Sequence, residues 1–234
     1  ASLFPGRIYL GLGRAPGSDQ MTARALRRNL PASSDEFPQD VVELLDLFSP
    51  APRSPVRAVP GTGLQVPVWI LGSSLFGAQL AAALGLPFAF ASHFAPAQMM
   101  QALEIYRARF EPSQYLAKPY VMLGFNVFAA DTQEDAEFRA TSMQQAFVNL
   151  RTGRPTKLPP PLRNYRAHLG PAENALLDSV LSRSAIGTPE VVAQAMRDFI
   201  ARTEADELML TCQIHDHAHR LRSLEIAAEV MLQH

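Results

Sequence analysis

Residues 66–87 read Val-Pro-Val-Trp-Ile-Leu-Gly-Ser-Ser-Leu-Phe-Gly-Ala-Gln-Leu-Ala-Ala-Ala-Leu-Gly-Leu-Pro. The β-branched and aromatic residues of 66–71 predict a strand buried on both faces. From Leu75 the apolar residues recur at helical spacing until Gly85, and Pro87 follows, which predicts a helix that ends at this glycine. The stretch is therefore expected to form a strand, a tight turn of small residues and a helix.

Two serines, Ser73 and Ser74, occupy the turn before this helix. The first N–H groups of a helix and the positive end of its dipole attract anions, and serine hydroxyls add further hydrogen-bond donors. One interpretation is therefore a phosphate-binding turn. An ordinary serine-capped helix explains the same residues, so this stretch alone leaves both interpretations open.

The composition of the 234-residue chain favours a globular α/β protein, because 47% of the residues are hydrophobic and 18% are charged. A net charge of −1 and a pI near 6.7 argue against nucleic acid or an anionic membrane as the main partner. Cys212 is the only cysteine, which excludes an intrachain disulfide and favours a reducing compartment. No apolar run is long enough to span a bilayer and no signal-peptide pattern is present, so we expect a cytoplasmic protein.

Strand-like and helical patterns alternate along the chain, which predicts a parallel sheet flanked by helices. This pattern does not separate an open sheet from a barrel. Helices are expected at 20–29, with Ser18 or Asp19 as the N-cap, and at 38–48. The five expected strands lie at 7–13, 66–71, 88–94, 120–130 and 207–212.

The whole of 1–234 is expected to form one domain with two irregular segments, 49–65 and 151–185, where the prolines cluster. The first of these segments is expected to hold a short exposed hairpin around 56–59. The second is expected to contain an amphipathic piece near 172–181. A further helix is predicted after Thr188, with Pro189 at its first position.

Polar candidates for a site follow the expected strands. Arg14 comes just after the first strand, where α/β proteins place ligand-binding side chains, although it could equally be a surface arginine paired with a carboxylate. His93 lies at the carboxyl end of the third strand, and a packed core histidine is the alternative. The closely spaced His215, His217 and His219 have no accompanying ligand pattern for zinc, so no metal site is assigned.

Three stretches of the chain together resemble the luciferase-like flavin monooxygenases, in particular a subgroup of uncharacterised luciferase-like oxidoreductases. The first reads Pro-Gly-Arg-Ile-Tyr-Leu-Gly-Leu-Gly-Arg-Ala-Pro-Gly over 5–17, the second Trp-Ile-Leu-Gly-Ser-Ser over 69–74, and the third Phe-Ala-Ser-His-Phe over 90–94. Ser-Met-Gln-Gln-Ala-Phe at 142–147, Gly-Thr-Pro-Glu at 187–190 and Ala-Asp-Glu at 205–207 extend the resemblance almost to the carboxyl end.

This resemblance implies a (β/α)8 TIM barrel that binds reduced FMN, or in some branches the deazaflavin F420, at the carboxyl ends of its strands. It places the flavin phosphate against Arg14 and the Ser73–Ser74 turn, and it places Ser92 and His93 on the ring or substrate side. His93 is then a candidate catalytic residue, and no other is assigned. The cofactor-binding residues expected from the resemblance are Gly13, Arg14, Gly72, Ser73, Ser74, Leu75 and Ser92.

The implied activity is a monooxygenase reaction that uses reduced FMN and O2 on a small organic substrate, with a separate flavin reductase and a homo-oligomeric protein. A non-catalytic flavin-binding relative or an F420-dependent dehydrogenase are the alternatives. The resemblance begins at the family's fourth strand. We therefore expect an incomplete barrel of about the last five βα units, either as a fragment or as a reduced relative that pairs with another chain.

Overall fold

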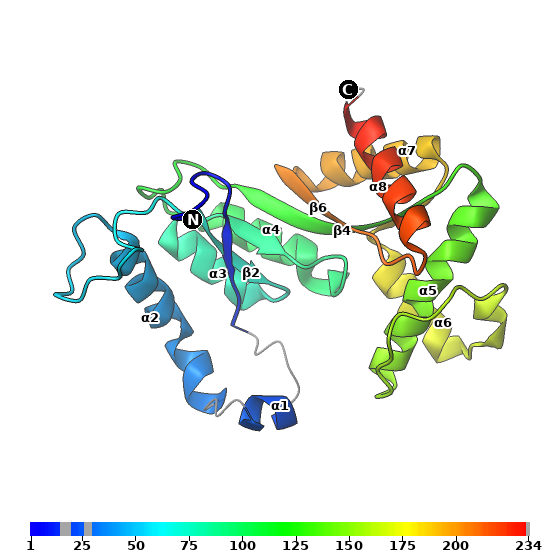
Figure 1. Ribbon diagram of the computed structural model, residues 1–234, viewed down its shortest axis with the longest axis horizontal. Helices are drawn as coiled ribbons and strands as arrows, with labels where there is room; N and C mark the ends of the chain where they lie inside the picture. The colour runs from blue at the N-terminus through cyan, green and yellow to red at the C-terminus, as the bar shows by residue number, and fades with distance from the viewer. Residues whose placement is uncertain (15–19, 26–29, 233–234) are drawn as a thin grey trace. The chain divides into compact units, whose positions relative to one another are not determined.

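The computed structural model of the chain describes residues 1–14, 20–25 and 30–232 (Figure 1). The N-cap expected at Ser18 or Asp19 and the second part of the helix expected over 20–29 lie outside these residues. The described chain divides into two compact units. The first unit comprises residues 1–90 and 100–121, and the second comprises residues 91–99 and 122–234. Because the two units are described separately, a single domain over 1–234 stays a prediction.

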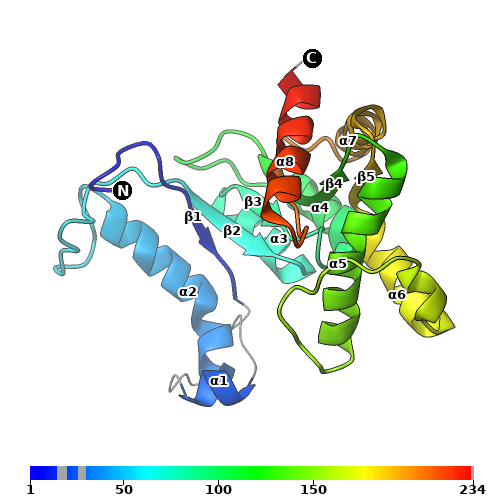
Figure 2. The same ribbon diagram turned by 45° about the vertical axis from the view of Figure 1, so that its right-hand side comes forward.

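The first unit contains a parallel sheet of three strands that run side by side, β1 (Leu10–Leu12), β2 (Val68–Gly72) and β3 (Phe88–Phe90) (Figure 2). Leu10 is aligned with Val68, and Ile70 is aligned with Phe88. Each strand falls within or close to a range expected from the sequence, but β1 and β3 are shorter than predicted. The expected strand–turn–helix over 66–87 is confirmed.

Helix α3 (Leu75–Leu84) packs against β2 and β3 because its buried face carries only small side chains. A Cβ atom placed on Gly77 would lie 3.4 Å from the Phe88 ring, so the helix and the sheet are in close contact there. Gly85 ends the helix in the left-handed conformation, with φ of 59°, as its position predicted. The closely packed helix fixes where its N-terminus meets the end of β2.

The other helices of the first unit are α1 (Gln20–Ala25), α2 (Leu30–Phe48) and α4 (Met99–Ala108), the last preceded by the 3-10 turn η1 (Pro96–Gln98). Helix α2 corrects the sequence prediction, because it starts eight residues before Pro38 and continues through this proline. A proline favours the first helical turn but is tolerated in the interior at the cost of one backbone hydrogen bond. The hairpin expected around 56–59 is also wrong, since these residues form turns and irregular chain.

The second unit is built on β4 (Val121–Ala129), which pairs in parallel with β5 (Ser184–Gly187) on one side and with β6 (Glu207–Thr211) on the other. Strand β4 is the longest of the described strands, as the sequence predicted (Figure 1). Strand β5 was not predicted, because its four residues extend from a segment expected to be irregular. Asn126 lies level with both Ser184 and Thr211 across the three strands.

Four long helices accompany this sheet: α5 (Gln133–Arg151), α6 (Pro171–Leu181), α7 (Pro189–Thr203) and α8 (His217–Leu232). The 3-10 turn η2 (Tyr165–His168) precedes α6. Thr132 caps α5 by accepting the N–H of Asp135, and Thr188 with Pro189 starts α7 as predicted. The core between α5, α6 and β4 is apolar, and includes Phe128, Phe147 and Leu177.

The parallel α/β class is confirmed in both units, and neither unit forms a closed barrel by itself. The incompleteness of the barrel stays a prediction. Among the described helices, none combines the length and the apolar character that a membrane crossing requires.

Candidate functional site

The carboxyl ends of β1 and β2 bring Arg14 and the Ser73–Ser74 turn to the same edge of the sheet. Leu12 is aligned with Ile70, so the same register continued by two residues sets Arg14 level with Gly72. The strands also approach closely beyond their pairing, because a Cβ on Gly13 would lie 3.1 Å from the Leu71 carbonyl oxygen. Two strand ends far apart in the sequence therefore present one guanidinium and two hydroxyls at one edge.

The N-terminus of α3 has the features of an anion site. Ser74 is its N-cap residue, with extended backbone angles of φ −136° and ψ 164°, but its side chain makes no capping hydrogen bond. The first turn of α3 contains no acidic residue. The N–H groups of the first turn lack intrahelical acceptors, and they carry the positive end of the helix dipole. Ser74 therefore occupies the cap position without supplying the side-chain hydrogen bond of an ordinary serine cap.

Arg14 lies against this first turn. Its guanidinium carbon is 4.1 Å from the centre of the Phe76 ring, which is the geometry of a cation–π contact. Among the described residues, Arg14 forms no ion pair with a carboxylate. The Phe76 ring holds the exposed guanidinium without neutralising its charge.

Gly72 and Leu75 complete this edge of the first unit. Nothing lies closer than 4.0 Å to a Cβ placed on Gly72, and that nearest atom is the Ser74 backbone nitrogen, so the backbone here is accessible. Leu75 begins α3 and is half-buried. The structure thus brings together six of the predicted cofactor residues, just after β1 and from the end of β2 to the start of α3. Their binding role stays a prediction.

Ser92 and His93 belong to the second unit, in the turn that follows residue 90. Ser92 is fully buried, and its hydroxyl donates a hydrogen bond of 2.6 Å to the carbonyl oxygen of Gly124 on β4. The His93 ring packs against the same glycine, and its Nδ1 is buried with no hydrogen-bond partner. Burial lowers the pKa of His93 below its usual value, because the charged imidazolium loses solvation.

Two residues of this second group, Gly124 and Asn126, were not singled out from the sequence. Asn126 is 1% exposed, and its side-chain amide donates to the His93 carbonyl oxygen at 2.9 Å. The sequence signal that could have identified them is a glycine and an asparagine inside an otherwise apolar strand. A glycine within a strand often marks the close approach of another part of the chain.

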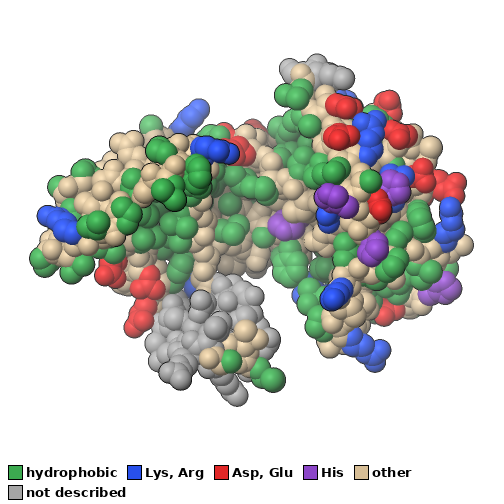
Figure 3. All heavy atoms as spheres, in the orientation of Figure 1, with side chains coloured by type: hydrophobic (Ala, Val, Ile, Leu, Met, Phe, Trp, Pro, Cys, Tyr) green, Lys and Arg blue, Asp and Glu red, His purple; other side chains and the backbone are tan. Residues whose placement is uncertain are grey.

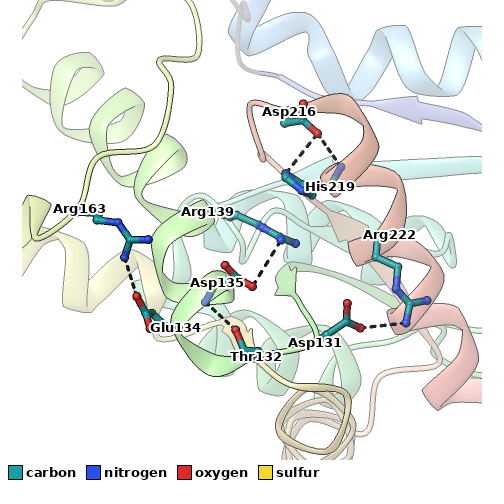
Figure 4. A network of polar contacts seen from close by, with 9 residues as sticks. All are labelled: Asp131, Thr132, Glu134, Asp135, Arg139, Arg163, Asp216, His219 and Arg222. Atoms are coloured by element: carbon teal, nitrogen blue, oxygen red, sulfur yellow. Dashed lines mark hydrogen bonds and ion pairs between the residues drawn. The ribbon is translucent and has the colours of Figure 1, made fainter.

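Two of the three clustered histidines make local polar contacts at the start of α8: His217 with Arg220 at 2.8 Å, and His219 with Asp216 (Figure 4). The Asp216 carboxylate accepts the backbone N–H of His219 at 2.9 Å, and it lies 3.3 Å from the His219 ring. Nearby, Arg222 on α8 pairs with Asp131 at 3.2 Å. In the described part of the chain, no three His, Cys, Asp or Glu side chains are grouped as metal ligands.

Charged side chains of both signs are interspersed with histidines over the face of the second unit around α8 (Figure 3). The ion pairs there are exposed, and such pairs contribute little to stability. This surface does not show the single sign of charge that attracts nucleic acid.

Comparison with known proteins adds a family match. A family model described as luciferase-like monooxygenase matches residues 1–207. A protein named luciferase-like monooxygenase from Escherichia coli (strain K12) is 53% identical over 230 residues, which are 98% of this chain and 69% of that protein. The uncharacterized protein YvbT from Bacillus subtilis (strain 168) is 50% identical over 231 residues, covering 98% of this chain and 68% of that protein.

Among solved structures, apo-MsnO8 matches with a TM-score of 0.82 and 28% identity, covering 99% of this chain and 70% of that one. Two structures of lower identity share the fold. One is the oxygenating constituent of 3,6-diketocamphane monooxygenase from Pseudomonas putida in complex with FMN, with a TM-score of 0.58, 17% identity and coverage of 94% and 69%. The other is an F420-dependent secondary alcohol dehydrogenase with an F420-acetone adduct, with a TM-score of 0.62, 12% identity and coverage of 97% and 71%.

Proposed function

Because the chain belongs to the luciferase-like monooxygenase family, we propose that it binds FMN and uses the reduced cofactor with O2 to oxidise a small organic substrate. A separate reductase would supply the reduced flavin, and the protein would act as a homo-oligomer. The observation that carries the cofactor assignment is the position of Arg14 beside the N-terminus of α3, where the N-cap residue Ser74 makes no side-chain capping hydrogen bond.

The chemistry of this arrangement fits a phosphate group. The guanidinium of Arg14 supplies a positive charge and a planar fork of donors, which suits phosphate oxygens. The hydroxyls of Ser73 and Ser74 and the first N–H groups of α3 supply further donors, and no acidic residue in the first turn opposes an anion. Gly72 leaves space beside the backbone at this edge, Gly13 lets its strand approach β2 closely, and Leu75 would add an apolar contact.

When bound, reduced flavin supplies the electrons and the reaction with O2. The residues of this chain would hold its phosphate, orient it and keep the site dry. Arg14 and the α3 N-terminus bind one end of the cofactor, which fixes where the other end lies. His93 is the titratable side chain proposed to act in catalysis, as the family resemblance implies.

The experiment compares FMN with riboflavin, which has the same ring and no phosphate. Arg14→Ala is expected to raise the Kd for FMN about tenfold, the low end for losing hydrogen bonds to a charged group, because Arg14 is exposed and solvent screens its charge. The Kd for riboflavin is expected to stay unchanged. Binding is followed by quenching of flavin fluorescence, with Arg109→Ala as an exposed arginine control in the first unit.

An equal loss of both flavins in Arg14→Ala, or no loss of FMN, would refute the phosphate assignment. Tighter binding of F420 than of FMN would favour the dehydrogenase alternative. With FMN, NADH, a flavin reductase and a trial organic substrate, a monooxygenase is expected to lower the hydrogen peroxide formed per O2 consumed, because one oxygen atom enters the substrate and the other leaves as water. Binding of FMN with a full peroxide yield for every substrate tried would contradict the monooxygenase activity.

A further inference from the structure

The turn that contains His93 is hydrogen-bonded to one face of β4. The Ser92 hydroxyl donates to the Gly124 carbonyl oxygen at 2.6 Å, and the Asn126 side chain donates to the His93 carbonyl oxygen at 2.9 Å. Residues two apart in a strand point to the same side, so Gly124 and Asn126 present one surface to the turn. These two contacts hold the backbone on both sides of the Ser92–His93 peptide.

The imidazole of His93 occupies the space that a side chain at position 124 would fill. A Cβ placed on Gly124 would overlap Nδ1 of His93 and lie 2.9 Å from its Cε1. Such an overlap cannot be relieved without moving the ring, because the imidazole is rigid and the backbone at Gly124 is held by its pairing with Met209 on β6. The His93 ring can therefore occupy this position only because residue 124 is a glycine.

The orientation of Asn126 is itself determined by the neighbouring strands. The hydroxyl of Thr211 on β6 donates to the Asn126 amide oxygen at 2.6 Å. The amide nitrogen donates to Ser184 Oγ on β5 at 3.2 Å as well as to His93. Because the oxygen is taken by a hydroxyl donor, the nitrogen is the end that faces the His93 carbonyl. The amide thus has one orientation in which all its partners are satisfied.

The surroundings of the ring favour one form of the imidazole. Nδ1 is buried without a partner, and a buried N–H with no acceptor is rarer in proteins than an unpaired acceptor. The contacts from β4 are uncharged. Partial burial lowers the pKa of His93 and so disfavours the imidazolium. With the imidazolium and the Nδ1–H form both disfavoured, the remaining form of His93 is the neutral ring with its proton on Nε2.

We propose that Gly124 and Asn126 are positioning residues that hold His93 as a neutral imidazole protonated at Nε2, so that the ring offers a hydrogen-bond donor to an oxygen atom of the substrate. The donor role rests on the proposed monooxygenase function, whereas the tautomer and its dependence on β4 do not. An Nε2–H donor suits a substrate with a carbonyl or similar acceptor, and it excludes His93 as a proton-accepting base through Nε2.

The test is a two-bond 1H–15N NMR spectrum of the histidine rings at neutral pH, recorded on the full chain without flavin. His93 is assigned by the signals lost in His93→Gln. One protonated and one unprotonated nitrogen are expected, with the pattern of the Nε2–H form. In Gly124→Ala the ring is displaced, and its two nitrogen resonances are expected to converge toward the average of a solvent-exposed histidine.

Gly170→Ala is the matched control, because a Cβ there meets only the end of the Glu173 side chain at 3.7 Å. It is expected to leave the His93 signals unchanged. Asn126→Asp is the second variant, since it keeps the shape of the side chain and replaces the donor facing His93 with an acceptor. It is also expected to bring the two nitrogen resonances of His93 closer together.

An Nδ1–H pattern or an imidazolium in the unsubstituted protein would overturn the proposal. Unchanged His93 signals in folded Gly124→Ala and Asn126→Asp would overturn it too. If the spectra behave as expected but FMN does not bind, the proposed function fails while the positioning of His93 stands. In the active protein, His93→Gln is expected to lower kcat with little change in the FMN Kd.

Discussion

Gly85 offers a direct measure of how tightly α3 is seated in the first unit. This residue ends the helix with φ of 59°, where the N–H of Leu86 bonds back to the carbonyl of Ala81 at 3.0 Å. A Cβ at this position would lie 2.5 Å from both the Glu111 carbonyl oxygen and the Ser113 Cβ. Gly85→Ala therefore meets two separate penalties, one from the backbone conformation and one from the overlap.

The magnitude follows from these two contributions. A non-glycine residue in the left-handed region costs about 1–2 kcal/mol. Forcing extra atoms into a filled space costs about 1–3 kcal/mol more, because the atoms in the way belong to backbone and to the stem of a side chain. Gly85→Ala is thus expected to lower the free energy of unfolding by about 2–5 kcal/mol.

Gly63→Ala is the control that separates the two contributions. Gly63 has φ of +83°, and nothing lies within 4 Å of a Cβ placed on it, so only the conformational penalty applies. Both variants are compared with the unsubstituted protein by urea unfolding followed by circular dichroism. Equal destabilisation by the two substitutions would refute the close packing at Gly85. A drop confined to Gly85→Ala would show that the overlap dominates.

Three further outcomes are expected. Ser223→Ala leaves the buried N–H of Ala129 without its 2.8 Å acceptor, and it is expected to cost about 1–3 kcal/mol in the same unfolding assay; a change below 0.5 kcal/mol would contradict this. Hydrogen bonds from the N–H groups of Arg53 and Ser54 lower the pKa of Asp46. The ionised Asp46 therefore stabilises the folded protein above the usual carboxyl pKa, and this stabilisation is lost as the pH falls through the lowered pKa. Asp46→Asn is then expected to weaken the acid-side dependence of stability, and an unchanged pH profile would refute the linkage. Burial raises the pKa of the Cys212 thiol, so a thiol reagent is expected to react slowly with the native protein near pH 7 and quickly after denaturation, and equal rates would refute the burial.

Local signals accounted for the elements that were predicted well. The apolar spacing from Leu75 and the glycine at position 85 defined α3 to within a residue, because both the spacing and the cap act within a few residues. Thr188 and Pro189 likewise marked the start of α7. The start of α2 was predicted wrongly from a local signal as well. Proline prefers the first turn of a helix, but α2 begins at Leu30 and continues through Pro38.

The candidate site, too, was predicted only in part from local signals. The residue types around Arg14 and the Ser73–Ser74 turn pointed to an anion, but the choice between a serine cap and an open helix end depended on the backbone and hydroxyl geometry of Ser74. The contact of Arg14 with the Phe76 ring is also a matter of spatial neighbours. Neither distinction is encoded in the order of the residues nearby.

By itself, the amino-acid sequence determined the parallel α/β class, most helix limits and the family, because periodicity, caps and short motifs are properties of neighbouring residues. Tertiary structure alone decided that β5 joins β4, that Gly124 makes room for the His93 ring, and that Asn126 spans from β5 to β6. These contacts join residues tens of positions apart, which come together only when parallel strands pair and when the turn at 92–93 packs on β4.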